Sequence, residues 1–294
     1  MKVLLAMDTS SASQAVLEEI AARPWPVDSS FEVISVVEPS HLWTTSEVAQ
    51  EAARRAQAVV RLAVERLEAK RQKATGAVLS GDPKTVILDR SRSTNADFVI
   101  VGSHGISALS RFLLGHVAAT VLRYAPCSVE VVRASIQSEG RGDMKVLLAT
   151  DGSEYSERAA RSIAERPWPA GTEIRVLSAV ELILPATRAL LEPPFIDSPF
   201  MESARAEAMK RAQDAIVRAQ QIISTTGLNV SESISVLLET PKAIILDEAA
   251  GWGADLIVLG SHGHRGLDRF LLGSVSEAVA MHAGCSVEII RKAG

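Results

Sequence analysis

Residues 260–274 read Gly260-Ser-His-Gly-His-Arg-Gly-Leu-Asp-Arg-Phe-Leu-Leu-Gly-Ser274 and follow the apolar run of residues 254–259. The run predicts a buried parallel strand that ends at Gly260, and the residues from Ser274 onward predict a helix, with Ser274 or Ser276 as its cap. A strand, a glycine-bearing loop and a helix N-terminus in this order are typical of a phosphate site. Glycines let backbone N–H groups converge on an anion, and the helix start adds free donors and the positive end of its dipole.

The spacing of the glycines carries most of the information. Gly260 and Gly263 stand three apart, nine residues follow, and Gly273-Ser274 closes the pattern. Two glycine clusters at this separation predict that the loop binds one phosphate chain from both sides. The loop has no lysine after its glycines, as GxxxxGK[ST] requires, and it does not fit GxGxxG.

The chain contains two copies of one pattern. Three stretches recur, the first two at an offset of 143 and the third at 158: Met1–Asp8 as Met144–Asp151, Arg23–Pro26 as Arg166–Pro169, and Ala96–Gly105 as Ala254–Gly263. The second copy therefore carries 15 extra residues, which we assign to the proline-bearing segment 182–199. A repeat this long predicts a duplicated domain, with copies at 1–133 and 144–294 joined by the polar linker 134–143.

Each copy alternates strands and helices. The expected strands are Lys2–Met7, Phe31–Val37, Ala77–Leu79, Asp97–Val101 and Ser128–Val132, then Lys145–Ala149, Glu173–Leu177, Ser233–Leu238, Asp255–Leu259 and Ser286–Ile290. Strict alternation predicts α/β domains with a parallel sheet covered on both faces and with ligands at the carboxyl ends of the strands.

Composition narrows the class of protein. The net charge of −4, with charges of both signs interspersed, predicts no nucleic-acid partner. No apolar run reaches the roughly 20 residues that cross a bilayer, and the N-terminus reads as a strand rather than a leader, so we expect a cytoplasmic protein without a membrane partner. The two cysteines, Cys127 and Cys285, fit buried reduced thiols.

The G-x2-G-x9-G-[S/T] pattern resembles that of ATP-binding members of the universal stress protein family, and the resemblance covers nearly the whole chain. It implies two Rossmann-like (adenine nucleotide α-hydrolase-like) domains, each with five parallel strands in the order 3-2-1-4-5. The implied cofactor is ATP, with Mg²⁺ or Mn²⁺ carried by its phosphates. Family homodimers pair their fifth strands, so we expect the two copies to form an intrachain pseudo-dimer, with a further homodimer open.

The resemblance also implies site residues. Asp151 and Asp8 match the ribose-binding Asp at the end of the first strand. Either side chain can also cap the following helix, and both roles can hold at once. Val36 and Ala179 match the residues beside adenine, although each can be an ordinary core position. The phosphate positions are Gly260, Gly263, Gly273, Ser274 and Val275 in the second copy, and Gly102, Gly105 and Gly115 in the first.

The first copy departs from the pattern at one position. His116 stands where the motif has Ser or Thr, and an imidazole there either blocks a phosphate or donates to it. His104 and His262 have no neighbouring ligands at metal-binding spacing, so we expect no protein-bound metal.

No catalytic residues emerge, because the chain has neither a Gly-x-Ser-x-Gly elbow nor the kinase signatures. We expect an ATP-binding regulatory protein of the stress response, with the second copy as its main site and at most slow hydrolysis. One alternative is an enzyme of adenylyl chemistry, although the Ser-Gly-Gly-x-Asp-Ser loop of such enzymes is missing after Asp8 and Asp151. The other is a structural adaptor without a ligand.

Overall fold

The computed structural model describes residues 1–39, 46–104, 114–133, 143–181, 199–237, 240–264 and 272–291. We call residues 1–133 the first half and residues 143–291 the second half. In the first half the elements are β1 (Lys2–Ala6), α1 (Ser11–Ala22), β2 (Ser30–Val37), α2 (Ser46–Ala69), β3 (Lys73–Ser80), α3 (Pro83–Ser93), β4 (Phe98–Gly102), α4 (His116–Tyr124) and β5 (Ser128–Val132).

The second half repeats this order. Its elements are β6 (Lys145–Ala149), α5 (Glu154–Ala164), β7 (Glu173–Glu181), α7 (Pro199–Ile223), the short 3-10 helix η2 (Ser224–Thr226), β8 (Asn229–Leu237), α8 (Pro241–Trp252), β9 (Leu256–Gly260), α9 (Ser274–His282) and β10 (Ser286–Ile290). Most of the predicted linker, residues 134–142, and most of the predicted insertion, residues 182–198, lie outside the described residues.

All ten strands form one sheet, in the order β3-β2-β1-β4-β5-β10-β9-β6-β7-β8. Each half therefore has the order 3-2-1-4-5 that the resemblance implied. Neighbours within a half are parallel, whereas β5 and β10 pair antiparallel. The expected pairing of the fifth strands is thus made within the chain, and it turns two sheets into one.

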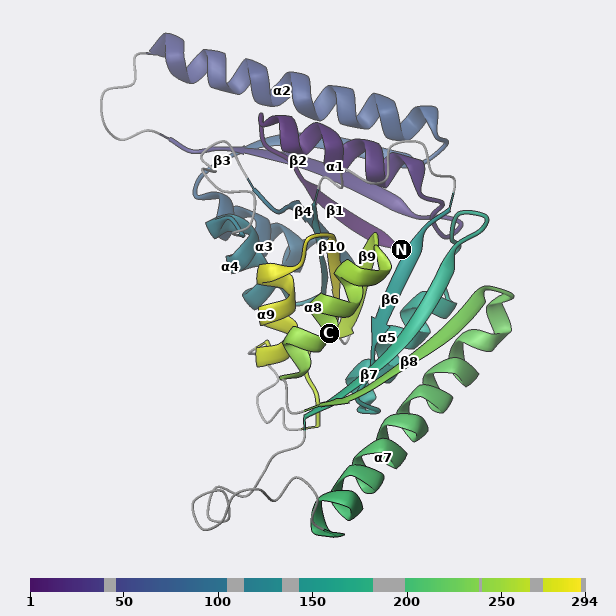
Figure 1. Cartoon of the computed structure of the whole chain (residues 1–294). Coiled ribbons are helices and arrows are strands. Elements are labelled where there is room, and N and C mark those ends of the chain that lie inside the picture. The colour runs from purple at the N-terminus through teal and green to yellow at the C-terminus, as the bar shows by residue number, and fades with distance from the viewer. Residues whose placement is uncertain are drawn as a thin grey trace, which may run out of the picture.

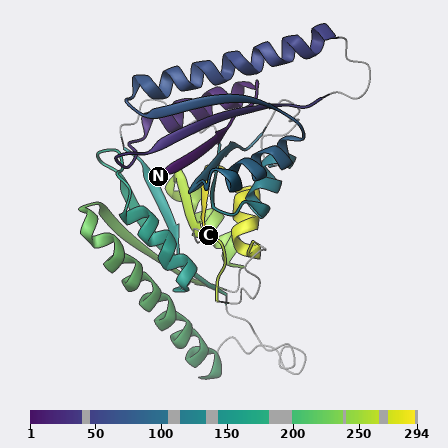
Figure 2. The ribbon, with the colours of Figure 1, turned by 180° about the vertical axis from the view of Figure 1, so that it is seen from behind.

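The core is divided by the faces of the sheet rather than by the two halves. One cluster of buried side chains lies under α3, α4, α8 and α9, and the other lies under α1, α2, α5 and α7. Figure 1 shows the long helices α2 and α7 at opposite ends of the molecule, and Figure 2 shows the same arrangement from behind. Since both clusters contain residues of both halves, the halves share their cores.

The first strands show why this sequence forms buried parallel strands. β1 and β6 have the same sequence, Lys-Val-Leu-Leu-Ala, and both faces of each are covered. Leu5, Leu147 and Leu148 are each 0% exposed. A continuous apolar run is what a strand covered on both faces requires.

The outer strands are longer than predicted. β3 spans eight residues where the sequence indicated three, and β8 begins at Asn229 rather than at Ser233. Both strands lie at an edge of the sheet, where a strand has one backbone partner and half-exposed side chains. Because edge strands contain polar residues, apolar runs in the sequence underestimate their length.

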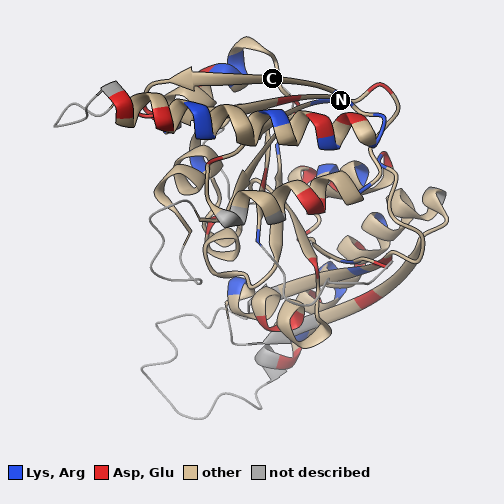
Figure 3. Cartoon of the chain, turned by 90° about the horizontal axis from the view of Figure 1, so that it is seen from above, with Lys and Arg blue, Asp and Glu red and all other residues tan. Residues whose placement is uncertain are grey.

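Charges of both signs are interspersed along the surface helices (Figure 3). Among the described residues, no helix is both long enough and apolar enough to cross a membrane.

Candidate functional site

The candidate site lies where β6 and β9 end side by side. These strands are parallel neighbours, and β7 pairs with the other side of β6. The order of the strands along the chain therefore reverses between β6 and β9, and open α/β sheets bind ligands at such a point. Asp151 follows β6 and the segment Gly260–His264 ends β9, so the two predicted loops meet here.

Asp151 holds these two loops together. One carboxylate oxygen, Oδ1, accepts the Ser153 N–H at 3.0 Å, and the other, Oδ2, accepts the His264 N–H at 3.1 Å. The His264 Nε2 lies 2.8 Å from the Asp151 carbonyl oxygen, which can only accept, so Nε2 carries a hydrogen. Each carboxylate oxygen keeps an acceptor position, and the residue as a whole is exposed.

Asp8 is engaged differently in the first half. Its Oδ1 accepts the N–H and the hydroxyl of Ser10, and also the Ser13 hydroxyl at 2.7 Å. Ser13 in turn accepts the Asp8 N–H at 2.9 Å. The Asp8 side chain therefore ties together the residues that precede α1, whose N-cap is Ser10 rather than Asp8.

The glycines of the second half have three different roles. A Cβ on Gly260 would lie 2.6–2.8 Å from backbone atoms of Tyr155 and Ser156, so this glycine allows α5 to touch the end of β9. A Cβ on Gly263 would lie 2.5 Å from the Asp151 Oδ2. Gly273 precedes α9 as its N-cap, and a Cβ there would lie 3.1 Å from the Ser261 carbonyl oxygen.

One part of the phosphate hypothesis needs correction. The N–H of Gly273 does not point to a ligand, because it donates to the Ser261 carbonyl at 2.8 Å. The helix cap is also Gly273 rather than Ser274 or Ser276, and the Ser276 hydroxyl donates to the Gly260 carbonyl at 2.7 Å. These bonds hold Gly260 and Ser261, at the end of β9, against the start of α9.

The backbone donors that remain free to bind a phosphate follow Gly273, in the first turn of α9. The Glu277 N–H makes the first bond of α9, to the Gly273 carbonyl at 2.9 Å. The N–H groups of Ser274 and Val275 therefore have no acceptor within the helix. Ser274 is exposed and Val275 half-buried, so a hydroxyl and two backbone donors are grouped at the positive end of this helix.

Val36 and Ala179 lie near the carboxyl ends of β2 and β7, the second strand of each half. Both side chains are half-buried and pack against a core cluster. The core alternative is therefore observed for both side chains, and only their backbone is left for an adenine.

The first half repeats the backbone bonds at its helix start but lacks the serine hydroxyl. The Ala119 N–H makes the first bond of α4, to the Gly115 carbonyl at 2.9 Å, so the N–H groups of His116 and Val117 also have no acceptor within the helix. The Gly115 N–H donates to the Ser103 carbonyl at 2.8 Å, as Gly273 does to Ser261. His116 is exposed at the first position of α4, where the second half has Ser274. Gly102 has room beside it, since a Cβ would lie 3.4 Å from the nearest atom, in Val16. Gly105 lies outside the described residues.

The structure adds a pair of groups that the sequence did not single out. The Ser261 hydroxyl lies 3.1 Å from the Nδ1 of His262, whose buried ring is 5.0 Å from that of Tyr155. The first half repeats the contact between Ser103 and His104, at 2.9 Å. In both halves the serine and the histidine are adjacent in the sequence, and this repeated Ser-His pair is the feature from which the contact could have been predicted. Among the described residues, no three His, Cys, Asp or Glu side chains form a group that could hold a metal.

A hollow of about 500 Å³ lies away from this site, at the amino ends of β1, β2 and β3. Lys2, Glu32 and Thr94 contribute to its lining. At the position of Thr94 the second half has Trp252, whose ring lies 4.4 Å from the Arg175 guanidinium. The first half thus has a small side chain, Thr94, beside the hollow, where the second half has the large ring of Trp252.

Comparison with known proteins identifies the family. The sequence profile of the universal stress protein family matches residues 1–133 and 144–291. A universal stress protein of Mycolicibacterium smegmatis is 31% identical over 208 residues, which are 70% of this chain and 64% of that protein's length. One of Thermus aquaticus is 32% identical over 146 residues, covering 50% of this chain and 97% of that protein.

A solved structure has the same architecture over the whole length. The crystal structure of a universal stress protein from Archaeoglobus fulgidus superposes with a TM-score of 0.65 at 23% identity, covering 99% of this chain and 96% of that one. The chain therefore belongs to the universal stress protein family.

Proposed function

We propose that the second half binds ATP at the ends of β6 and β9, and that the protein acts as a nucleotide-dependent regulatory module of the stress response. Asp151 takes the ribose, the start of α9 takes the phosphates, and the backbone of Ala179 borders the adenine. Mg²⁺ or Mn²⁺ enters on the phosphates, and the ATP is turned over slowly at most.

One observation carries this proposal: hydrogen bonds connect all three segments of the site. His264 binds Asp151, and Gly273 binds Ser261, so the residues directly after β9 are bonded both to the end of β6 and to the start of α9. The protein groups that we assign to the ribose and to the phosphates are thus connected to one another before a ligand binds. Preorganisation of this kind lowers the entropy lost on binding.

The remaining acceptors of Asp151 support the role of the ribose ligand. Its two oxygens each accept one backbone N–H, from Ser153 and His264, and each keeps a second lone pair. Two acceptors on one carboxylate suit the two adjacent hydroxyls of a ribose. In the first half Asp8 has three donors on one oxygen, and His116 replaces the serine at the helix start, so we assign the main site to the second half.

The test is the nucleotide that the purified protein carries. Mass spectrometry of the supernatant after heat denaturation should find ATP at about one per chain. AMP with pyrophosphate would favour adenylyl chemistry, and an empty protein that also fails to bind added ATP in calorimetry would favour the adaptor.

The variant Gly273→Val locates the site. Its Cβ would lie 3.1 Å from the Ser261 carbonyl oxygen and 3.3 Å from the His262 Cα, so the larger side chain should displace the start of α9 from the end of β9. We expect it to lose ATP while keeping the wild-type circular dichroism spectrum. Gly115→Val is the matched control, because Gly115 makes the same backbone bond in the first half. ATP retained by Gly273→Val and lost by Gly115→Val would place the main site in the first half instead.

A further inference from the structure

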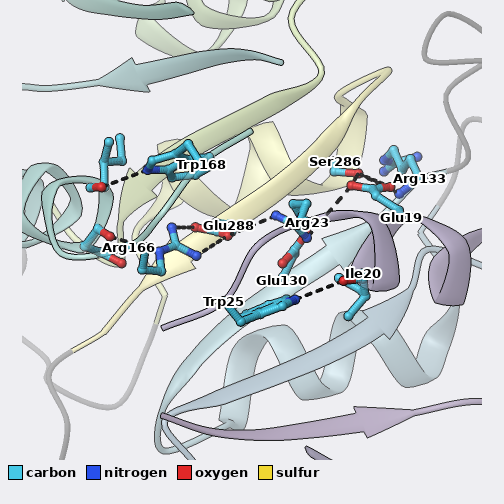
Figure 4. Close-up of polar contacts among 12 residues, drawn as sticks. Glu19, Ile20, Arg23, Trp25, Glu130, Arg133, Arg166, Trp168, Ser286 and Glu288 are labelled. Atoms are coloured by element: carbon cyan, nitrogen blue, oxygen red, sulfur yellow. Dashed lines mark hydrogen bonds and ion pairs between the residues drawn. The ribbon is translucent and has the colours of Figure 1, made fainter. Parts of the chain in front are cut away.

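The junction between the two halves contains a cluster of buried charges that the nucleotide site does not use (Figure 4). Glu130 of β5 and Glu288 of β10 are direct partners in the antiparallel strand pair, and both side chains are 0% exposed. Arg23 reaches the pair from the first half and Arg166 from the second half. Glu19 of α1 completes the cluster, with a side chain that is 26% exposed.

The two glutamates of the strand pair are not equally neutralised. Arg166 binds Glu288 through both nitrogens, at 2.8 and 2.6 Å. Arg23 binds Glu130 through a single nitrogen, and it also lies 3.7 Å from Glu288 and 3.9 Å from Glu19. Glu130 therefore shares its arginine with two other carboxylates, whereas Glu288 has an arginine of its own.

The cluster contains three carboxylates and two guanidinium groups. The odd carboxylate comes from Glu19, because the second half has Ser162 at the equivalent position. A fully ionised cluster would carry one excess negative charge, which is unfavourable because Glu130 and Glu288 are fully buried and Glu19 is only 26% exposed. Glu130 Oε2 is also buried without a hydrogen-bond donor among the described residues.

The other charged groups around the junction are engaged elsewhere. The Arg133 guanidinium donates to the carbonyls of Ala280 and Met281, at the end of α9. That of Arg291 donates to the carbonyls of Leu122 and Arg123, at the end of α4. Each half thus caps a helix of the other, as a two-fold arrangement requires.

The remaining titratable groups do not balance the odd carboxylate either. Asp97 and Asp255 accept the backbone N–H groups of Lys2 and Lys145 at the opposite ends of their strands. Burial raises the pKa of the thiols of Cys127 and Cys285, so both are neutral.

We propose that the junction is a proton-binding site: near neutral pH one proton resides on Glu130 and is shared with Glu288, and its loss weakens the association of the two halves. Protonation satisfies the orphaned oxygen and balances the three carboxylates against the two arginines. The proposed site binds a proton and nothing else, and no covalent bond other than the O–H bond forms or breaks.

The directions of the pKa shifts follow from this geometry. Burial raises the pKa of Glu19, with the charge of Arg23 and the hydrogen bond from the Ser286 hydroxyl acting against it, so Glu19 competes with Glu130 for the proton. Burial raises the pKa of Glu130 to about 8, with Arg23 acting against it. Burial acts to raise the pKa of Glu288 as well, but the charge and hydrogen bonds of Arg166 and the charge of Arg23 together outweigh it and lower that pKa. A carboxyl whose pKa is higher in the folded state than in the unfolded state binds its proton on folding. Its contribution to stability is therefore complete at low pH and is lost as the pH rises toward 8.

The test compares urea unfolding of the wild type and of Glu130→Gln at pH 5.5, 6.5 and 7.5. Each pH unit should raise the unfolding equilibrium constant of the wild type by up to tenfold relative to that of Glu130→Gln, because the amide needs no proton. Taking the difference removes the contribution of the histidines, which is common to both proteins. Equal pH dependence in the two proteins would overturn the proposal.

Two further measurements locate the proton. Glu19→Ser copies the second half and removes the odd carboxylate, whose negative charge helps to raise the pKa of Glu130. The loss of stability with rising pH should therefore occur at lower pH in Glu19→Ser than in the wild type. If Glu19→Ser abolished the pH dependence while Glu130→Gln kept it, the proton would reside on Glu19 and the proposal would be wrong. Should Glu130→Gln fail to fold, infrared spectra of the wild type at pH 6 and pH 9 decide: a protonated carboxyl band should be present at pH 6 and absent at pH 9.

Discussion

Gly260 and Gly102 occupy equivalent positions, yet the structure predicts opposite effects when each is replaced by alanine. A Cβ on Gly260 would lie 2.6 Å from the carbonyl carbon of Tyr155 and 2.8 Å from the Ser156 nitrogen. Both are backbone atoms at the start of α5, so no side chain can rotate away. A Cβ on Gly102 would lie 3.4 Å from a methyl group of Val16 and 3.5 Å from the His104 carbonyl oxygen, which is ordinary contact.

The magnitudes follow from these distances. Forcing a methyl group into a packed region costs about 1–3 kcal/mol of unfolding free energy. Replacing glycine by alanine returns about 0.4–1 kcal/mol by restricting the unfolded chain, provided that the backbone is compatible. Neither glycine has a positive φ, so the backbone accepts alanine at both positions. We expect Gly260→Ala to lose about 1–2 kcal/mol, and Gly102→Ala to gain a few tenths up to about 1 kcal/mol by the same entropy argument.

The assay is urea unfolding of the wild type and both variants at one pH, followed by circular dichroism, with nucleotide content measured alongside. The midpoint should fall for Gly260→Ala and stay equal or rise for Gly102→Ala, with unchanged slopes. Gly260→Ala should also retain less ATP, because Ser153, the N-cap of α5, donates its N–H to Asp151. If both variants shifted the midpoint equally, or if Gly260→Ala were the more stable, the close contact with α5 would not be what requires glycine at position 260.

Two further predictions concern the first half and the junction. His116→Ser should raise the ATP content from about one toward two per chain, as measured by mass spectrometry, if the imidazole obstructs the start of α4; a rise that also occurs in His282→Ser, at an exposed histidine elsewhere, would not support this explanation. Arg166→Met should lower the unfolding free energy by about 3–5 kcal/mol in urea titrations, because Glu288 would be left buried without its partner. The double variant Arg166→Met with Glu288→Leu should recover much of this loss, and a double variant less stable than the single one would contradict that account.

The glycine motif of the second half shows how much of this region could be predicted from the sequence. The apolar run before Gly260 predicted a strand and the residues from Ser274 onward predicted a helix, and both are found as β9 and α9, whereas residues 265–271 lie outside the described residues. The letters could not reveal that the Gly273 N–H is consumed by Ser261, because a hydrogen bond across a loop depends on how the loop closes. The same limit applies to Val36 and Ala179, whose side chains pack into the core while any contact with adenine would come from the backbone.

The sequence by itself determined the duplication, the alternation of strands and helices, and the buried central strands, because these follow from internal repetition and from local apolar periodicity. The order of the strands came from the resemblance to a family, since alternation is compatible with several orders. Only the tertiary structure placed Glu130 opposite Glu288. Each occurs in a Ser-Val-Glu stretch that reads as an ordinary strand, and each becomes a buried charge only when β5 and β10 pair. Local patterns record which face of an element is apolar, whereas the partner across a strand depends on contacts between segments far apart in the chain.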